Sequence, residues 1–179
     1  MAGNLLARSM HDLSAAAWFG GSLMGAVGLN GAAAAAKDPK ERTRLSTLGW
    51  AKWAPVQTAA FAVHAVGGIG LILGNKGRLA SQGGAQANTI IKSAVTLAGM
   101  ALTLYSGMLG KKVGKLADEG AEGATEPKSG ASAELQAAQK QLKMLQWALP
   151  AVSGLVIVLG AQQGEQQRPT NILDSIRKR

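Results

Sequence analysis

Four blocks of apolar residues divide the chain, with more polar segments between them. The blocks cover 13–36, 54–74, 89–110 and 144–161. Each is close to the roughly 20 residues that a helix needs to cross a hydrocarbon layer about 30 Å thick. A soluble bundle would alternate apolar and charged faces, whereas the 13–36 block has no charged residue. The pattern predicts an all-α integral membrane bundle of four transmembrane helices, forming a single membrane domain over 1–179.

The first block also has features of a secretory signal peptide. Arg8 precedes an apolar run, and the run ends in the small residues of 32–36, which resemble a cleavage site. We expect the block to be retained as a membrane anchor.

The segment 37–53 has the signals of a short helix. Asp38 can cap the helix, Pro39 suits its first turn, and Glu41 stands three residues after the cap. Apolar residues then recur on roughly one face, opposite basic ones. We expect a short interfacial helix that lies on the membrane surface.

The remaining connections differ in composition. Residues 75–88 are short and polar, as in an exposed turn. Residues 111–131 mix Gly, Glu and Lys with few apolar residues, which predicts a long, partly mobile third loop. Ser132 is a candidate cap for one long helix that continues into the fourth block. The basic tail, 164–179, has the pattern of a segment on a membrane surface.

Charge and cysteine usage narrow the partners. The chain has 19 basic and 10 acidic residues, a net charge of +9, and no cysteine. Because the basic residues flank the apolar blocks, we expect the lipid bilayer and its anionic headgroups as partners, and no nucleic acid. The absence of cysteine excludes disulfides and thiolate metal sites. Loops 37–53 and 111–143 hold most of the basic residues, so the positive-inside rule places them in the cytoplasm of a multi-pass bacterial plasma-membrane protein.

Polar residues inside the apolar blocks are costly and need a reason. They are Asn30, Gln57, His64 and Lys92. His64 lies about 15 Å into the second block at about 1.5 Å per residue. One interpretation is a neutral histidine bonded to a carbonyl or hydroxyl of another helix, such as Thr96 or Thr103. The other makes His64 a candidate cofactor-binding residue.

The two histidines together are typical of a haem site, in which paired imidazoles hold an iron. His11, however, precedes the first block, and His64 lies near the middle of the second. Their expected offset along the membrane normal is about 15 Å, which one iron cannot bridge. We therefore predict no cofactor and no metal.

Two contacts between polar residues are predicted. Asp12 and Lys92 form an interfacial pair, so that His11 and Asp12 mark a helix boundary; the alternative is a proton-handling site. Asn30 and Gln57 lie at comparable depth, which predicts a side-chain hydrogen bond between them.

Small residues at helical spacing predict close helix packing on three of the blocks. The packing residues are Ala17, Gly21, Gly25, Gly70, Gly74, Gly99, Thr103 and Gly107. The fourth block lacks such a stripe, so we expect it at the periphery. The Gly-rich run at 68–74 lies within an apolar block, without the solvent access that a nucleotide phosphate needs.

The string HDLSAAAWFGG, residues 11–21, resembles the opening helix of small bacterial membrane proteins of the copper-resistance protein D type. The resemblance covers this one helix. It implies a helical membrane fold with metal or haem handling, and His11 is the residue carried over.

No catalytic constellation is visible in the sequence. We therefore predict a non-enzymatic membrane protein that acts as an accessory or assembly subunit of a larger complex, with other membrane-protein subunits as partners. The alternative is a small transporter, or a haem-, metal- or quinone-handling protein, centred on His64.

Overall fold

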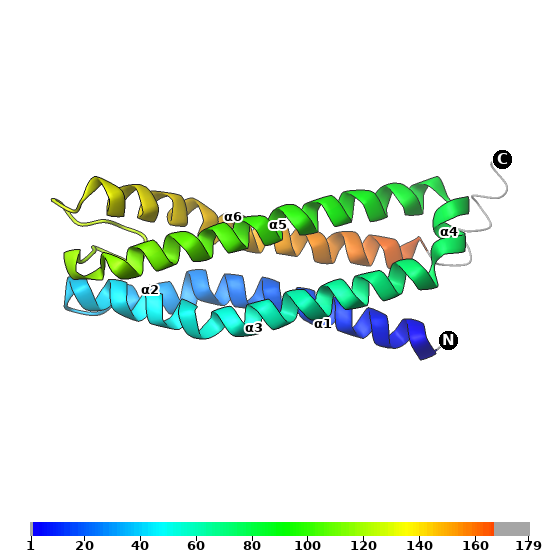
Figure 1. Ribbon diagram of the computed structural model, residues 1–179, viewed down its shortest axis with the longest axis horizontal. Helices are drawn as coiled ribbons and strands as arrows, with labels where there is room; N and C mark the ends of the chain where they lie inside the picture. The colour runs from blue at the N-terminus through cyan, green and yellow to red at the C-terminus, as the bar shows by residue number, and fades with distance from the viewer. Residues whose placement is uncertain (1, 167–179) are drawn as a thin grey trace.

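Four long helical rods lie side by side in the computed structural model, which describes residues 2–166 (Figure 1). The first rod consists of α1 (Ala2–Met24), the π-helical turn η1 (Gly25–Leu29) and α2 (Asn30–Ala34), and the others are α3 (Pro39–Gly74), α5 (Gly83–Lys115) and α6 (Ala133–Glu165). The short helices α4 (Lys76–Ser81) and η2 (Ala117–Glu119) lie in the connections. The predicted basic tail lies outside the described residues from 167 onward.

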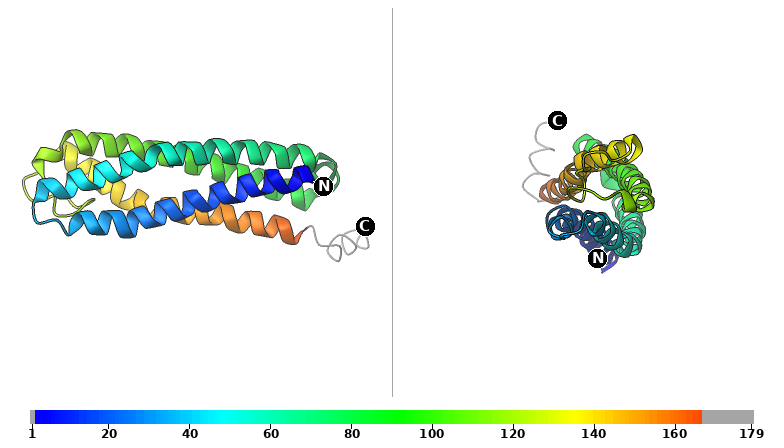
Figure 2. Two further views of the ribbon diagram at one scale, coloured as in Figure 1. Left: turned by 90° about the horizontal axis from the view of Figure 1, so that it is seen from below. Right: turned by 90° about the vertical axis from the view of Figure 1, so that its left-hand side faces the viewer.

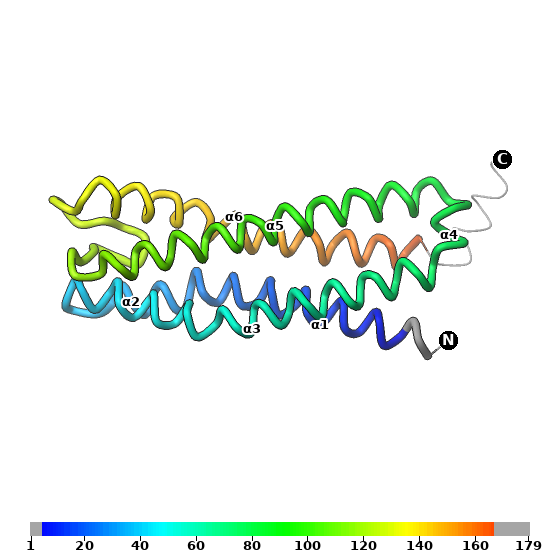
Figure 3. The backbone as a smooth tube through the Cα atoms, viewed as in Figure 1, coloured from blue at the N-terminus to red at the C-terminus, as the bar shows by residue number. Residues whose placement is uncertain are grey.

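The order of the rods around the bundle is α1, α3, α5, α6, as the end-on view in Figure 2 shows. Helix α1 begins and α6 ends at the same end of the bundle as α4 (Figure 3). We call this the α4 end. The opposite end carries residues 116–132, and we call it the loop end. The two ends turn out to be built very differently.

Three of the helices are long and apolar enough to cross a membrane: α3, α5 and α6. The first rod divides the apolar block 13–36 among α1, η1 and α2, and its early turns carry the charged residues Arg8 and Asp12. The described part of the chain is helical apart from its connections, so the all-α prediction is confirmed.

The predicted surface helix over 37–53 is wrong, because these residues form the beginning of α3, a continuous helix of 36 residues. Its predicted start is confirmed: the backbone N–H of Lys40 donates to Asp38 Oδ1 at 2.9 Å, and Pro39 opens the first turn. Pro55 lies at the junction with the apolar block, inside α3, and does not end the helix. Thr43 is fully buried in the bundle, so packing rather than a membrane surface holds the first turns of α3.

The third loop is folded rather than mobile, which corrects the prediction for 111–131. Helix α5 continues to Lys115, and beyond it Ala121 and Ala124 are buried. The N–H of Ala121 donates to the carbonyl of Pro39 at 3.0 Å. Small residues let this backbone lie directly on the helices, where its polar groups find partners. The predicted cap of the last helix is confirmed, since Leu135 N–H donates to Ser132 Oγ at 3.2 Å.

Helix α6 is an integral part of the four-rod bundle and is not peripheral, although its lack of small residues predicted a peripheral position. Ser153 and Val156 are fully buried in its middle, and α6 packs on both α5 and α1. The main apolar cluster joins α5, the loop and α6 at the loop end, and consists of Leu109, Val113, Ala131, Leu135, Ala138 and Leu145. Larger apolar side chains such as leucine and valine therefore hold α6 in the bundle, where close packing through small residues had been the expected way to hold a helix.

Candidate functional site

The two histidines of the chain lie against each other. Their ring centroids are 4.0 Å apart and the ring planes are inclined by 34°. The predicted offset of about 15 Å is therefore wrong. It was counted from the edges of the apolar blocks, whereas α1 begins well before its block and runs inside the bundle from its early turns.

A glycine of α3 makes this approach of the helices possible. A Cβ added at Gly67 would lie 2.6 Å from the backbone nitrogen of His11 and 2.7 Å from the carbonyl oxygen of Ala7. Backbone therefore meets backbone here, without a side chain between the helices. The sequence analysis did not select Gly67. Its position three residues after His64, on the same helical face, is the signal that would have found it.

Hydrogen bonds fix the orientation of both imidazoles. His64 Nδ1 lies 3.1 Å from the carbonyl oxygen of His11 and 3.3 Å from Ser14 Oγ. His11 Nδ1 lies 2.9 Å from Asp12 Oδ1. His64 thus meets a carbonyl of another helix, as one interpretation predicted, but that helix is α1 and not the one that carries Thr96. Both Nδ1 atoms are engaged, which leaves the two Nε2 atoms for other contacts.

The two rings are in contact, so a haem cannot lie between them. The reason is therefore the contact of the rings and not a difference in their depth in the membrane. Within residues 2–166, no group of three or more His, Cys, Asp and Glu side chains is arranged to hold a metal ion.

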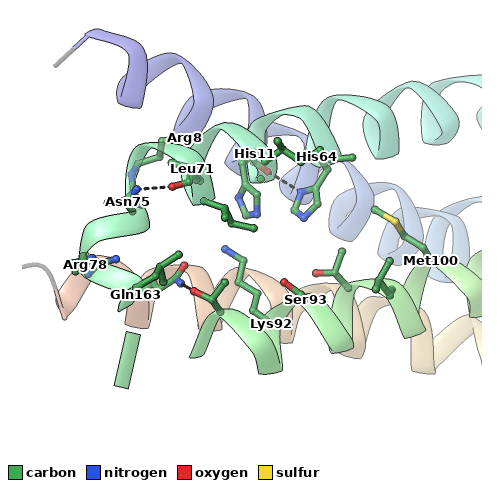
Figure 4. A pocket seen from close by; sticks show the side chains of 18 residues that line it. Arg8, His11, His64, Leu71, Asn75, Arg78, Lys92, Ser93, Met100 and Gln163 are labelled. Carbon is green, nitrogen blue, oxygen red and sulfur yellow. Dashed lines mark hydrogen bonds between the residues drawn. The ribbon is translucent and has the colours of Figure 1, made fainter. Parts of the chain in front are cut away.

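Lys92 of α5 points toward the two imidazoles (Figure 4). It is only 8% exposed. The predicted pairing with Asp12 is not formed: Asp12 bonds to His11, its side chain is 56% exposed, and no described carboxylate lies within 4.0 Å of Lys92 Nζ. Asp12 is thus largely exposed on α1 and bonds to the neighbouring His11.

A cavity of about 300 Å³ lies between α3 and α5 beside these three side chains. Its composition changes along the bundle axis. Arg8, Asn75, Arg78 and Gln163 line the α4 end, the histidines and Lys92 line the middle, and Leu97 and Met100 line the inner part (Figure 4). Among the described residues, no aspartate or glutamate lines it. Leu71, Ile72 and Leu79 also line the α4 end, so the charged residues lie there and in the middle among apolar ones, and the inner part has no charged residue.

The cavity opens sideways, between two helices. Three of its lining residues are also on the outer surface of the bundle: Ile69 is 58% exposed, Ile72 is 42% exposed and Leu97 is 67% exposed. Helix α3 packs chiefly on α1, and α5 packs chiefly on α6, so the seam between α3 and α5 is the loosest of the bundle.

Positive charge gathers at the outer end of the cavity. Partial burial, together with the neighbouring Arg8, lowers the pKa of the Arg78 guanidinium, which lies in α4 outside the apolar helices. An arginine starts from such a high pKa that it stays protonated at neutral pH. Two cationic side chains therefore face the same space.

The predicted Asn30–Gln57 hydrogen bond is not formed. Asn30 Nδ2 donates to Gln146 Oε1 at 3.0 Å, and Asn30 Oδ1 accepts from Ser46 Oγ and from Trp50 Nε1, each at 3.0 Å. Gln57 accepts instead from Trp53 Nε1 at 3.1 Å. The π turn η1 directly precedes Asn30 and changes the direction in which its side chain points. Counting residues along a regular α-helix does not include this change.

The predicted packing residues have different surroundings. A Cβ at Gly21 would overlap the ring of Trp53, one at Gly25 the ring of Trp50, and one at Gly99 both Trp18 and Val152. These three glycines therefore make room for large side chains rather than for a helix backbone.

The other predicted packing residues are less constrained. A Cβ at Gly70 would lie 3.0 Å from that of Ala7, and Thr103 Oγ1 donates to the carbonyl of Gly99 at 2.9 Å. Ala17 is half-buried and Gly74 is exposed. Gly107 has open space around it, with nothing within 4 Å of an added Cβ.

Comparisons with protein-family models, curated proteins and solved structures found no match. The fold itself defines the class of protein: over residues 2–166 the chain is helical, with three helices long and apolar enough to cross a membrane.

Proposed function

We propose that this chain is a four-span protein of the bacterial plasma membrane that binds an amphiphilic molecule in the cavity between α3 and α5. One observation carries the proposal: the charged lining residues are confined to the α4 end and the middle of the cavity, the inner part is uncharged, and exposed apolar side chains flank the opening between α3 and α5. An amphiphile has the same division of polarity. A cavity of about 300 Å³ is at the lower end of the range for small-molecule sites, which fits a headgroup with part of a chain.

The outer surface of the first rod supports the proposal that this rod also crosses the membrane, in addition to α3, α5 and α6. Leu13, Met24 and Val27 are exposed there, as are Val63 and Val66 on the neighbouring α3. Such a continuous apolar surface is unfavourable in water and favourable in lipid.

The level of the cavity also fits an amphiphile. Exposed large apolar side chains on α5 begin at Ile90 and end at Met108, a length of about 27 Å at 1.5 Å per residue, close to the thickness of the hydrocarbon layer. Lys92 then lies near the boundary of that layer. The basic part of the cavity is at headgroup level and the apolar part is deeper, which is how a lipid-like molecule is oriented in a bilayer.

The protein acts in this proposal by binding and not by catalysis. The engaged Nδ1 atoms fix the two imidazoles, and the cavity offers recognition groups rather than an activated nucleophile. This is the His64-centred alternative of the sequence analysis, with His11 and Lys92 added to it.

An accessory-subunit role is the second candidate, and one observation favours it. Gly107 faces outward on α5 with open space around it, between the exposed side chains of Leu104 and Met108. A small residue on a lipid-facing surface is a contact point for another transmembrane helix. A partner held there would be lost from gently extracted complexes when Gly107 is replaced by leucine.

Native mass spectrometry after mild extraction from bacterial membranes tests the binding proposal. The unaltered protein should retain one bound amphiphile. Ala65→Phe should lose it, because Ala65 lines the cavity and is exposed enough to accept a ring without a clash in the core. The matched control is Ala62→Phe, an exposed alanine of the same helix that does not line the cavity. Equal occupancy in all three proteins, or none in any, would contradict the proposal.

A further inference from the structure

Lys92 is the only buried lysine among the described residues. Burying an ammonium group is costly unless an acceptor compensates for the lost water. No described carboxylate lies within 4.0 Å of Lys92 Nζ, and the protein provides it with no hydrogen bond within residues 2–166. The side chain nevertheless points into the cavity, toward the two histidines (Figure 4).

We infer that the cavity holds a phosphate group, with Lys92 Nζ donating to its oxygens and the chain of the ligand lying toward Leu97 and Met100. The inference rests on the proposed function and names the substrate class of the same site. An ionised oxygen acceptor gives the buried ammonium a charge-assisted bond, the kind that roughly doubles the strength of a neutral hydrogen bond. A cationic or zwitterionic headgroup would instead place a positive charge among Arg8, Arg78 and Lys92.

The neighbouring acid makes no direct ion pair or hydrogen bond with Lys92 Nζ in the described part of the chain. Asp12 is held by His11 Nδ1 at 2.9 Å, at the outer surface. His11 and His64 form the wall opposite Lys92, and each is fixed by a bond at Nδ1. Thr89, which accepts from Gln163 Nε2 at 2.6 Å, closes the wall toward α6. The cavity is thus bounded by groups from α1, α3, α5 and α6.

The phosphate has two possible sources, an anionic lipid or free phosphate, and the experiment separates them. The purified full chain in neutral detergent is titrated with phosphatidylglycerol, with diacylglycerol of the same acyl chains, and with inorganic phosphate, and bound species are counted by native mass spectrometry. We expect phosphatidylglycerol to bind at least about tenfold more tightly than diacylglycerol, as one charge-assisted contact implies. Competition by inorganic phosphate at similar concentration would assign the site to free phosphate.

Variants locate the contact. Lys92→Gln should remove the preference for phosphatidylglycerol, and Lys92→Arg should keep it, because arginine also donates to phosphate. Lys111→Gln is the matched control, an exposed lysine of the same helix outside the cavity. Thermal unfolding of each variant shows that it is folded, and the lipid comparison on the unaltered protein decides the question even where a variant is not.

The outcomes separate this inference from the proposed function. Binding of both lipids with equal affinity, unchanged in Lys92→Gln, would overturn the phosphate assignment and leave an amphiphile site in place. Binding of neither lipid by the unaltered protein would overturn both.

Discussion

The same four rods are closely packed at the loop end of the bundle and enclose a cavity at the α4 end. At the loop end, Leu135 and Gln139 are fully buried and the folded residues 116–132 close the bundle. At the α4 end, the rods enclose a cavity of about 300 Å³, and a buried lysine faces two histidines. In our proposal, cohesion and recognition are therefore separated along the axis. A tightly packed end holds the rods together, so that the other end can keep an opening.

The separation has a physical basis in the surroundings of each end. Basic residues such as Lys140 and Lys143 flank the loop end, so in our proposal it lies in water, where burial of apolar side chains is favourable. From the headgroup level at the α4 end inward, lipid surrounds the rods in our proposal, and removing an apolar side chain from lipid into protein gains little. Close backbone contact at Gly67 holds the helices there instead.

The largest expected effect contrasts two leucines. Leu135→Ala should lower the free energy of unfolding by about 2–5 kcal/mol, because it leaves a hole in the core of the loop end. Leu97→Ala, at an exposed position lining the cavity, should change it by less than about 0.5 kcal/mol. Chemical or thermal unfolding of the detergent-solubilised proteins measures both. Equal losses would mean that the two ends contribute alike.

A smaller effect is expected where the wall of the cavity is held together. Gly67→Leu should destabilise the protein by about 1–3 kcal/mol, since the new side chain must push the backbone of α1 away from α3. Gly107→Leu is the control, because open space surrounds that glycine. Thermal unfolding with both variants in one detergent provides the comparison. If the control is destabilised as much, close helix contact is not what Gly67 provides.

The smallest effect concerns the polar contacts that join the first rod to the loop end. Asn30→Ala and Gln146→Ala should each cost about 1 kcal/mol, in keeping with hydrogen bonds between membrane helices. Because the two side chains bond directly, the double variant should cost less than the sum of the single ones. Unfolding free energies of the four proteins form the cycle, and strict additivity would show that the pair is not coupled.

Much of the fold follows from local signals in the sequence. The apolar blocks gave the four rods, and the caps at Asp38 and Ser132 mark helix starts that the structure confirms. These signals depend on residues within a few positions of each other. The division of α3 at residue 53 was wrong, because a change from an amphipathic to an apolar pattern does not by itself end a helix, and α3 continues through Pro55.

The site could be predicted in its parts but not in its arrangement. His64 and Lys92 were selected because polar groups in apolar blocks need a reason, and His11 because it precedes one. Their meeting depends on how far α1 slides along α3, which the close contact at Gly67 sets. No residue count within one block contains that information. The misplaced Asp12–Lys92 pair has the same origin.

The π turn η1 gives the first rod two independent halves. The N–H of Asn30 bonds to the carbonyl of Gly25, five residues back, so the turn contains one residue more than a regular helix. One inserted residue rotates everything beyond it by about 100° around the rod. This rotation of the backbone lets both His11 and Asn30 face their separate partners on α3. Deleting one residue of Gly25–Leu29 would make a straight helix in which only one of these two faces meets its partner at a time.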